Sequence, residues 1–173
     1  RDAGKLAGLD VLRIVNEPTA ASLAYGIGLD PEESKTIAVY DLGGGTFDIS
    51  ILQIDNGIFE VLSTNGDTFL GGDDFDRAII DYWVEHYSID KSRLQSDKNF
   101  SQALRLEAEE AKKTLSLTDN FQSEIDGLEL EISKERFNEL VLLLVNTTIT
   151  ACKNALKDAV KTAIKGFKKA DFS

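Results

Sequence analysis

Apolar residues between positions 36 and 64 form short runs of the length of β-strands, separated by glycine and polar residues. The runs predict three strands, at about 36–42, 46–55 and 58–64. Asp55-Asn56-Gly57 separates the last two strands. Asn-Gly is the strongest short signal for a β-hairpin, because both positions of its turn take a positive φ. We therefore expect the second and third strands to pair as a hairpin.

The rest of the chain reads mainly as helix, since its apolar positions recur with a period near 3.6 residues. Helices are expected at the start of the chain, from Pro18 to about Gly26, at about 73–87 and 98–115, and from Ser133 through residue 160 with a bend. Two other segments are expected to be strands. Val11 to Val15 reads as a short strand, and 122–125 with 128–132 reads as a small hairpin around Asp126-Gly127.

One turn in this pattern carries candidate chemistry. Asp41 ends the first predicted strand, and Gly43, Gly44, Gly45 and Thr46 lead into the second. Three glycines remove every Cβ from the bend, so backbone N–H groups can approach an anion closely. A carboxylate beside such a loop can hold hydrated Mg²⁺. The alternative is a glycine-rich hairpin without a ligand, because short glycine motifs also occur by chance.

Composition narrows the class of protein. With 42% hydrophobic residues in 173, the chain suits one or two globular units. A net charge of −11 would repel nucleic acid. A single cysteine, Cys152, excludes an internal disulfide and fits a reducing compartment. No apolar run reaches membrane-spanning length and no signal peptide is visible, so no membrane association is expected. The absence of methionine predicts a piece of a longer protein.

Four stretches together resemble the seventy-kilodalton heat-shock chaperone family, the DnaK-type ATPases. They are Asp41 to Asp48, Asn16 to Ala21, Leu70 to Asp76 and Glu109 to Ser116, and they occur in the family's order. The resemblance covers roughly residues 1–160. It implies an α/β actin-like (ribonuclease-H-like) ATPase fold, second lobe only. Residues 1–71 would form the base of the lobe with a mixed sheet, 72–148 a smaller α+β upper subdomain, and 149–173 a return helix with an atypical tail.

The resemblance also implies a site for ATP or ADP with Mg²⁺. Glu17 would orient the attacking water, Asp41 would hold the metal, and Thr46 would act beside it. Gly43, Gly44, Gly45 and Thr46 would contact the phosphates, and Gly71 and Gly72 would lie near the ribose and phosphates. Glu109, Lys112 and Ser116 would contact adenosine. Each assignment has a structural alternative. Glu17 could instead stabilise the N-terminus of a helix, and Asp41 could form an Asx-turn. Gly71-Gly72 could be a plain strand-to-helix turn, and the helix with Glu109, Lys112 and Ser116 could present a solvated face with an ion pair.

The implied activity is ATP hydrolysis that drives client binding and release. The family's first phosphate loop, catalytic lysine and peptide-binding domain are not in this sequence, so we expect the chain alone to be nearly inactive. Asp73-Asp74 and the short hairpin at 120–132 look closest to the iron–sulfur-assembly (HscA-like) branch. That branch implies a J-domain co-chaperone, a scaffold protein as client, a possible exchange factor at the upper subdomain, and a bacterial cytoplasmic or mitochondrial matrix location. A general DnaK-type chaperone, a small-molecule kinase of the same superfold and a non-catalytic interaction module are the alternatives.

Overall fold

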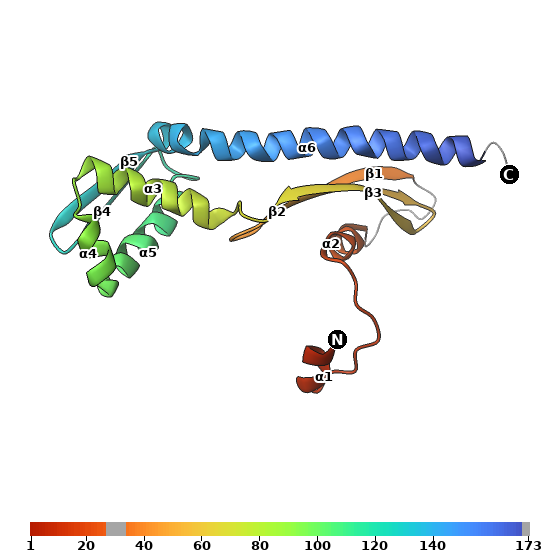
Figure 1. The fold of residues 1–173 in the computed structure, drawn as a ribbon, viewed down its shortest axis with the longest axis horizontal. Coiled ribbons are helices and arrows are strands. Elements are labelled where there is room, and N and C mark those ends of the chain that lie inside the picture. The colour runs from red at the N-terminus through yellow and green to blue at the C-terminus, as the bar shows by residue number, and fades with distance from the viewer. Residues whose placement is uncertain (27–33, 171–173) are drawn as a thin grey trace. The chain divides into compact units, whose positions relative to one another are not determined.

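The computed structural model describes residues 1–26 and 34–170. Their order along the chain is αα, βββ, ααα, ββ, α. The elements in Figure 1 are α1 (Asp2–Leu6), α2 (Glu17–Gly26), β1 (Lys35–Leu42), β2 (Phe47–Asp55), β3 (Ile58–Asp67), α3 (Gly72–His86), α4 (Lys91–Ser96), α5 (Lys98–Thr114), β4 (Asn120–Ile125), β5 (Leu128–Ser133) and α6 (Lys134–Ala170).

The described chain forms two compact units. Unit 1 contains residues 1–41, 48–65 and 152–173, and unit 2 contains residues 42–47 and 66–151. This division groups the glycine loop and residues 66–71 with unit 2. The subdomain boundaries expected from the family resemblance, at 71/72 and 148/149, stay a prediction.

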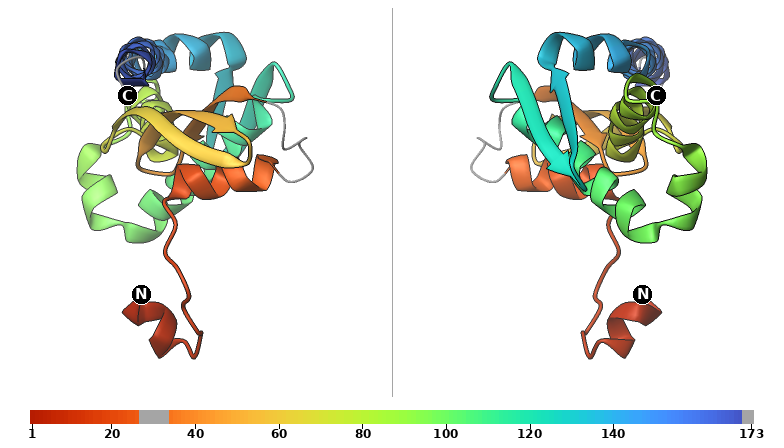
Figure 2. Two further views of the ribbon diagram at one scale, coloured as in Figure 1. Left: turned by 90° about the vertical axis from the view of Figure 1, so that its right-hand side faces the viewer. Right: turned by 90° about the vertical axis from the view of Figure 1, so that its left-hand side faces the viewer.

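Unit 1 is built on the sheet β1-β2-β3, in which β2 is the central strand. In Figures 1 and 2, α2 covers one face of this sheet and the second half of α6 covers the other. The central strand is therefore buried on both faces, with Ile49, Ile51, Leu52 and Ile54 at most 5% exposed. Ser63 of β3 donates from Oγ to the carbonyl of Ala155 in α6 at 2.7 Å, which fixes the helix on the sheet.

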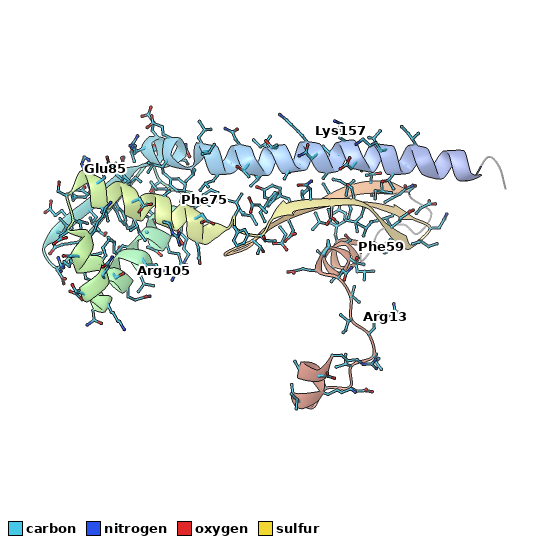
Figure 3. The ribbon with its side chains drawn as sticks, in the orientation of Figure 1. Arg13, Phe59, Phe75, Glu85, Arg105 and Lys157 are labelled. Carbon is cyan, nitrogen blue, oxygen red and sulfur yellow. The ribbon has the colours of Figure 1, made fainter. Side chains whose placement is uncertain are left out.

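Unit 2 packs α3, α4 and α5 against the hairpin β4-β5. Its core includes Ile79, Trp83, Leu104, Ala108 and Leu130, each at most 1% exposed; Figure 3 shows the side chains that fill this unit. The indole Nε1 of Trp83 donates to the carbonyl of Glu131 at 2.9 Å. The N–H of Glu131 donates to the hydroxyl oxygen of Tyr87 at 3.0 Å. Trp83 of α3 and Tyr87, the residue directly after that helix, thus satisfy both backbone groups of one residue in β5.

Both predicted Gly turns are confirmed. Asn56 and Gly57 have φ of 49° and 74°, and Asp126 and Gly127 have φ of 51° and 76°. These are the positive values that a two-residue hairpin turn requires. In the second hairpin, Asn120 to Ile125 pair antiparallel with Ser133 to Leu128.

The structure differs from the sequence prediction in one segment that forms no strand and in one helix that was not predicted. Residues 11–15 form no strand, and Leu12 and Ile14 are 86% and 68% exposed. An apolar run becomes a strand only beside a pairing partner, and no described strand offers it one. Helix α4 was not expected, although Asp90 caps it by accepting the N–H of Ser92 at 2.8 Å. The predicted cap at Ser133 is confirmed, because its Oγ accepts the N–H of Arg136 at 3.1 Å, and the helix runs from Lys134 to Ala170 without interruption.

Candidate functional site

The loop between β1 and β2 leaves backbone donors open. It closes through one hydrogen bond, from the N–H of Gly43 to the carbonyl of Thr46 at 2.9 Å. The N–H groups of Gly44 and Gly45 donate to no residue that the structure describes, and both residues are exposed. Successive free N–H groups on an exposed bend form the kind of concavity that binds an anion.

The folded chain itself does not require glycine at two of these positions. A Cβ built on Gly44 or Gly45 meets no atom within 4 Å. Neither residue has a positive φ. Neither packing nor backbone conformation therefore explains why side chains are missing there. A bare backbone with open N–H groups does fit the close approach of a phosphate.

The segment Gly71-Gly72-Asp73 supports this loop within unit 2. The N–H of Gly72 donates to the carbonyl of Gly43 and the N–H of Asp73 to that of Gly44, each at 2.8 Å. Two of the donors at the start of α3, which no helical carbonyl could accept, thus bind the loop. Gly71 has to be glycine, because a Cβ there would overlap the backbone of Gly44 and Gly45. Its own N–H donates to Oδ2 of Asp74 at 2.9 Å.

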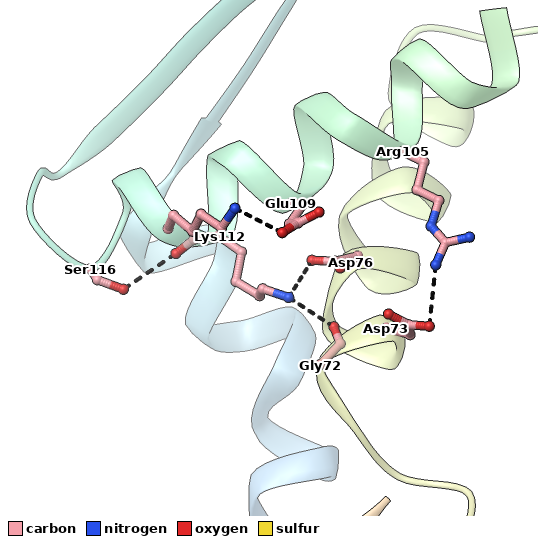
Figure 4. A network of polar contacts seen from close by, with 8 residues as sticks. Gly72, Asp73, Asp76, Arg105, Glu109, Lys112 and Ser116 are labelled. Atoms are coloured by element: carbon pink, nitrogen blue, oxygen red, sulfur yellow. Dashed lines mark hydrogen bonds and ion pairs between the residues drawn. The ribbon is translucent and has the colours of Figure 1, made fainter. Parts of the chain in front are cut away.

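The three residues expected to contact adenosine lie at and just beyond the end of α5 (Figure 4). Glu109 and Lys112 are on the helix, but α5 ends at Thr114, so Ser116 lies in the following turn. The hydroxyl of Ser116 donates to the carbonyl of Lys112 at 3.3 Å. The expectation that all three share one helix face therefore holds for Glu109 and Lys112 only.

Glu109 and Lys112 have separate partners. Oε1 of Glu109 lies 2.7 Å from Nζ of Lys113. The hydrogen bond and charge of Lys113 hold the pKa of Glu109 below its usual range. Nζ of Lys112 lies 2.7 Å from Oδ1 of Asp76 and donates to the carbonyl of Gly72 at 3.1 Å. Sequence reasoning missed both Lys113 and Asp76, although the spacing of four residues from Glu109 to Lys113 is a recognisable ion-pair signal.

Unit 1 contains a cavity of about 260 Å³ lined by three carboxylates. Glu17 begins α2, Asp41 lies in β1 and Asp48 lies in β2, and all three are exposed. Asn16, Pro18, Val39, Ser50 and Thr64 complete the lining. The structure thus brings Glu17 and Asp41 to one cavity, and the roles that the resemblance implies for them stay predictions. Asp48 was not predicted as a site residue. The feature of the sequence that could have indicated it is an acidic residue inside an otherwise apolar strand.

The carboxylates of the cavity have oxygen atoms of the kind that can support a hydrated cation. Among the described residues, no group of three or more His, Cys, Asp or Glu side chains is arranged to enclose a metal ion. Mg²⁺ keeps several water ligands and often binds through one or two carboxylates plus a phosphate. Asp41, which directly precedes the loop segment, has the donor chemistry for that mode.

Comparison with protein families decides which family this is. The family model described as Hsp70 protein matches residues 1–165. The chain belongs to the Hsp70 family. Hsp70 proteins are nucleotide-binding chaperones, and the mixed α/β elements with small sheets fit their actin-like ATPase fold. In the described part of this Hsp70 chain, no helix is both long and apolar enough to span a membrane.

Proposed function

We propose that this Hsp70 chain binds the phosphates and adenosine of ATP or ADP together with Mg²⁺. The observation that carries the proposal is the loop at Gly44-Gly45. Its N–H groups are open, its glycines are not needed for folding, and its carbonyls are held from behind by Gly72 and Asp73. A phosphate bound there would take up the free donors. The membership in a nucleotide-binding family supports the same conclusion.

The other residues take roles by their chemistry. Asp41 would hold Mg²⁺ through water, and Glu17 and Asp48 are the acidic groups of its cavity that could orient a water for phosphoryl transfer. Thr46 adds a hydroxyl next to the open loop. Glu109, Lys112 and Ser116 would bind adenosine. Bound Mg²⁺ would supply charge neutralisation at the phosphates.

The decisive variant is Gly45→Val, which tests binding apart from folding. A Cβ at position 45 meets open space, so the valine should keep the stability of unit 2 within about 0.5 kcal/mol of the unchanged chain, as is usual for surface substitutions. The valine side chain should weaken the affinity for ADP by at least about tenfold, because it fills the space at the free N–H groups. Calorimetric titration with Mg·ADP measures this. Gln95→Ala, an exposed change in α4, is the control.

A second pair of variants distinguishes the binding of Mg²⁺ from the orientation of the attacking water. Asp41→Asn should reduce the increase in ADP affinity that Mg²⁺ gives, because it removes a metal-supporting charge. Glu17→Gln should leave that increase intact and slow single-turnover ATP hydrolysis in a protein that contains the complete ATPase domain. Equal Mg²⁺ dependence in all three proteins would contradict the role of Asp41.

We further propose that the chain belongs to the iron–sulfur-assembly branch rather than to the general DnaK-type chaperones. Support comes from Asp73-Asp74 and from the hairpin β4-β5, whose two six-residue strands are joined by only Asp126-Gly127. The partners would then be a dedicated J-domain co-chaperone, a scaffold client and a nucleotide exchange factor at unit 2, in the cytoplasm of a bacterium or in the mitochondrial matrix. Stimulation of the complete ATPase by an iron–sulfur J-domain protein, compared with a general one, tests this assignment. Family membership argues against the kinase alternative.

A further inference from the structure

Asp76 is unusual among the acidic residues of this chain. It is 5% exposed, and it is the one buried residue with an ionisable carboxylate or ammonium among those that the structure describes. A buried carboxylate is costly unless a charge or hydrogen bonds compensate it. Oδ1 of Asp76 has no hydrogen bond of good geometry among the described groups, so its compensation is the charge of Lys112 at 2.7 Å.

Joining α3 to α5 does not require this ion pair. Apolar contacts among Ile79, Leu104, Ala108 and Ala111 already form the core between the two helices. A second ion pair, from Arg105 to Asp73 at 3.2 Å, links the same helices at the surface. A buried ion pair stabilises a fold little compared with apolar residues of the same volume, and its best-supported use is to fix one arrangement over others.

The arrangement that the pair fixes is visible in Figure 4. Lys112 extends its ammonium to Asp76 and to the carbonyl of Gly72. The N–H groups of Gly72 and Asp73 hold the carbonyls of Gly43 and Gly44. A continuous chain of contacts thus runs from the carboxylate through the ammonium and the start of α3 to the glycine loop, entirely within unit 2.

We propose that Asp76 is a positioning residue for the nucleotide site, holding the Lys112 ammonium on Gly72 and thereby fixing the segment Gly72-Asp73 beneath the loop. The link to a nucleotide rests on the function proposed above. An ammonium has three N–H donors. The carbonyl of Gly72 accepts from one of them, and the carboxylate of Asp76 holds the ammonium by its charge. Lys112 therefore keeps a donor for a ligand while both protein contacts stay in place. Without Asp76, the lysine stem is free to rotate, and the ligand-facing donor loses its fixed direction.

The first measurement needs no nucleotide. Amide hydrogen exchange is followed at Gly72 and Asp73 in the whole chain, unchanged and as Asp76→Asn. The variant keeps the size of the side chain and removes its charge. Exchange at these two amides should accelerate by about tenfold, which corresponds to 1.4 kcal/mol of local opening. The control is Arg105→Gln, which breaks the surface pair between the same helices and should leave both amides within about twofold of the unchanged rate.

The second measurement is the affinity for Mg·ADP, which Asp76→Asn should weaken about three- to tenfold and Arg105→Gln should not change. Faster exchange with unchanged ADP affinity would make Asp76 a structural residue only and overturn the proposal. Unchanged exchange, or equal acceleration in Arg105→Gln, would overturn it as well. If the unchanged chain binds no ADP, the proposed function fails, and the exchange rates alone decide whether Asp76 holds the segment. If Asp76→Asn does not fold, the apolar pair Asp76→Leu with Lys112→Met replaces it in the exchange measurement only, because removing the Lys112 ammonium also removes a proposed adenosine contact; unchanged exchange at Gly72 and Asp73 in that pair would overturn the proposal.

Discussion

The two adjacent glycines before and at the start of α3 should respond oppositely to alanine. At Gly71 a Cβ overlaps three backbone atoms, the O and C of Gly44 and the N of Gly45. Backbone atoms cannot rotate away as a side chain can, so the loop has to move. The φ of Gly71 is −161°, which any residue adopts, so the cost is steric and not conformational.

The magnitude follows from what the displacement breaks. Overpacking of this kind costs about 1–3 kcal/mol. Moving the loop also weakens the hydrogen bonds from Gly72 to Gly43 and from Asp73 to Gly44, each worth about 0.5–1.5 kcal/mol. We expect Gly71→Ala to lower the free energy of unfolding of unit 2 by about 2–4 kcal/mol.

Gly72→Ala is the matched control. The nearest atom to its Cβ is Nζ of Lys112 at 3.3 Å, which is a side-chain atom and needs to shift by only a few tenths of an ångström, whereas the atoms at Gly71 are backbone. Alanine also loses less conformational entropy than glycine when a helix forms. The variant should therefore be between neutral and about 1 kcal/mol more stable than the unchanged chain.

Urea unfolding followed by tryptophan fluorescence measures both variants. Trp83 is the single tryptophan of the chain and is fully buried in unit 2, so the signal reports on that unit. If Gly71→Ala unfolds at the same urea concentration as Gly72→Ala, the close approach of Gly71 to the loop does not matter and our account of the loop's support is wrong.

Three further predictions concern unit 2. Burial raises the pKa of Tyr87. This residue therefore contributes stability that is fully present below pH 10 and is lost as the pH rises through the pKa of the folded state. Replacing the hydroxyl in Tyr87→Phe should make the urea midpoint fall less steeply above pH 10. Lys113→Met should raise the pKa of Glu109 toward its ordinary value, by more than Arg105→Gln does, in a carbon NMR titration of the carboxyl. Asp97→Ala removes the acceptor for the N–H of Phe100 at the start of α5 and should cost about 1 kcal/mol in Trp83-monitored unfolding, with Asp90→Ala at the short helix α4 as the comparison.

Features that depend on neighbouring residues could be predicted from the sequence. The turns at Asn56-Gly57 and Asp126-Gly127 follow from two residues each, because only such residues accept positive φ cheaply. The helix start at Gly72, with Asp73 and Asp74 in its first turn, was likewise local. The strand expected at 11–15 failed because pairing depends on a partner that no periodicity reveals.

The candidate site also combines features that the local sequence predicts with contacts that only the fold creates. The glycine loop stands out in the sequence, whereas its support from Gly72 and Asp73 depends on segments nearly thirty residues apart in the chain. Lys112 was singled out by the family resemblance, but its contact with Asp76 links positions thirty-six residues apart, and nothing local marks it. Asp48 shares a cavity with Glu17 only because α2 and β2 meet in the fold.

The order in which the two units are encoded has a consequence for synthesis on the ribosome. The chain passes between the units at 41/42, 47/48, 65/66 and 151/152, so neither unit is one uninterrupted stretch. The core of unit 2 lies between Ile79 and Ile132 and therefore leaves the ribosome before the second half of α6 does. The sheet of unit 1 is made earlier, yet the helix residues that cover it, such as Ala155 and Ala159, arrive last. The nascent chain should therefore complete the core of unit 2 first. The face of the sheet that α6 covers stays exposed until residue 159 has left the ribosome, and this is the interval in which the chain is most prone to aggregation.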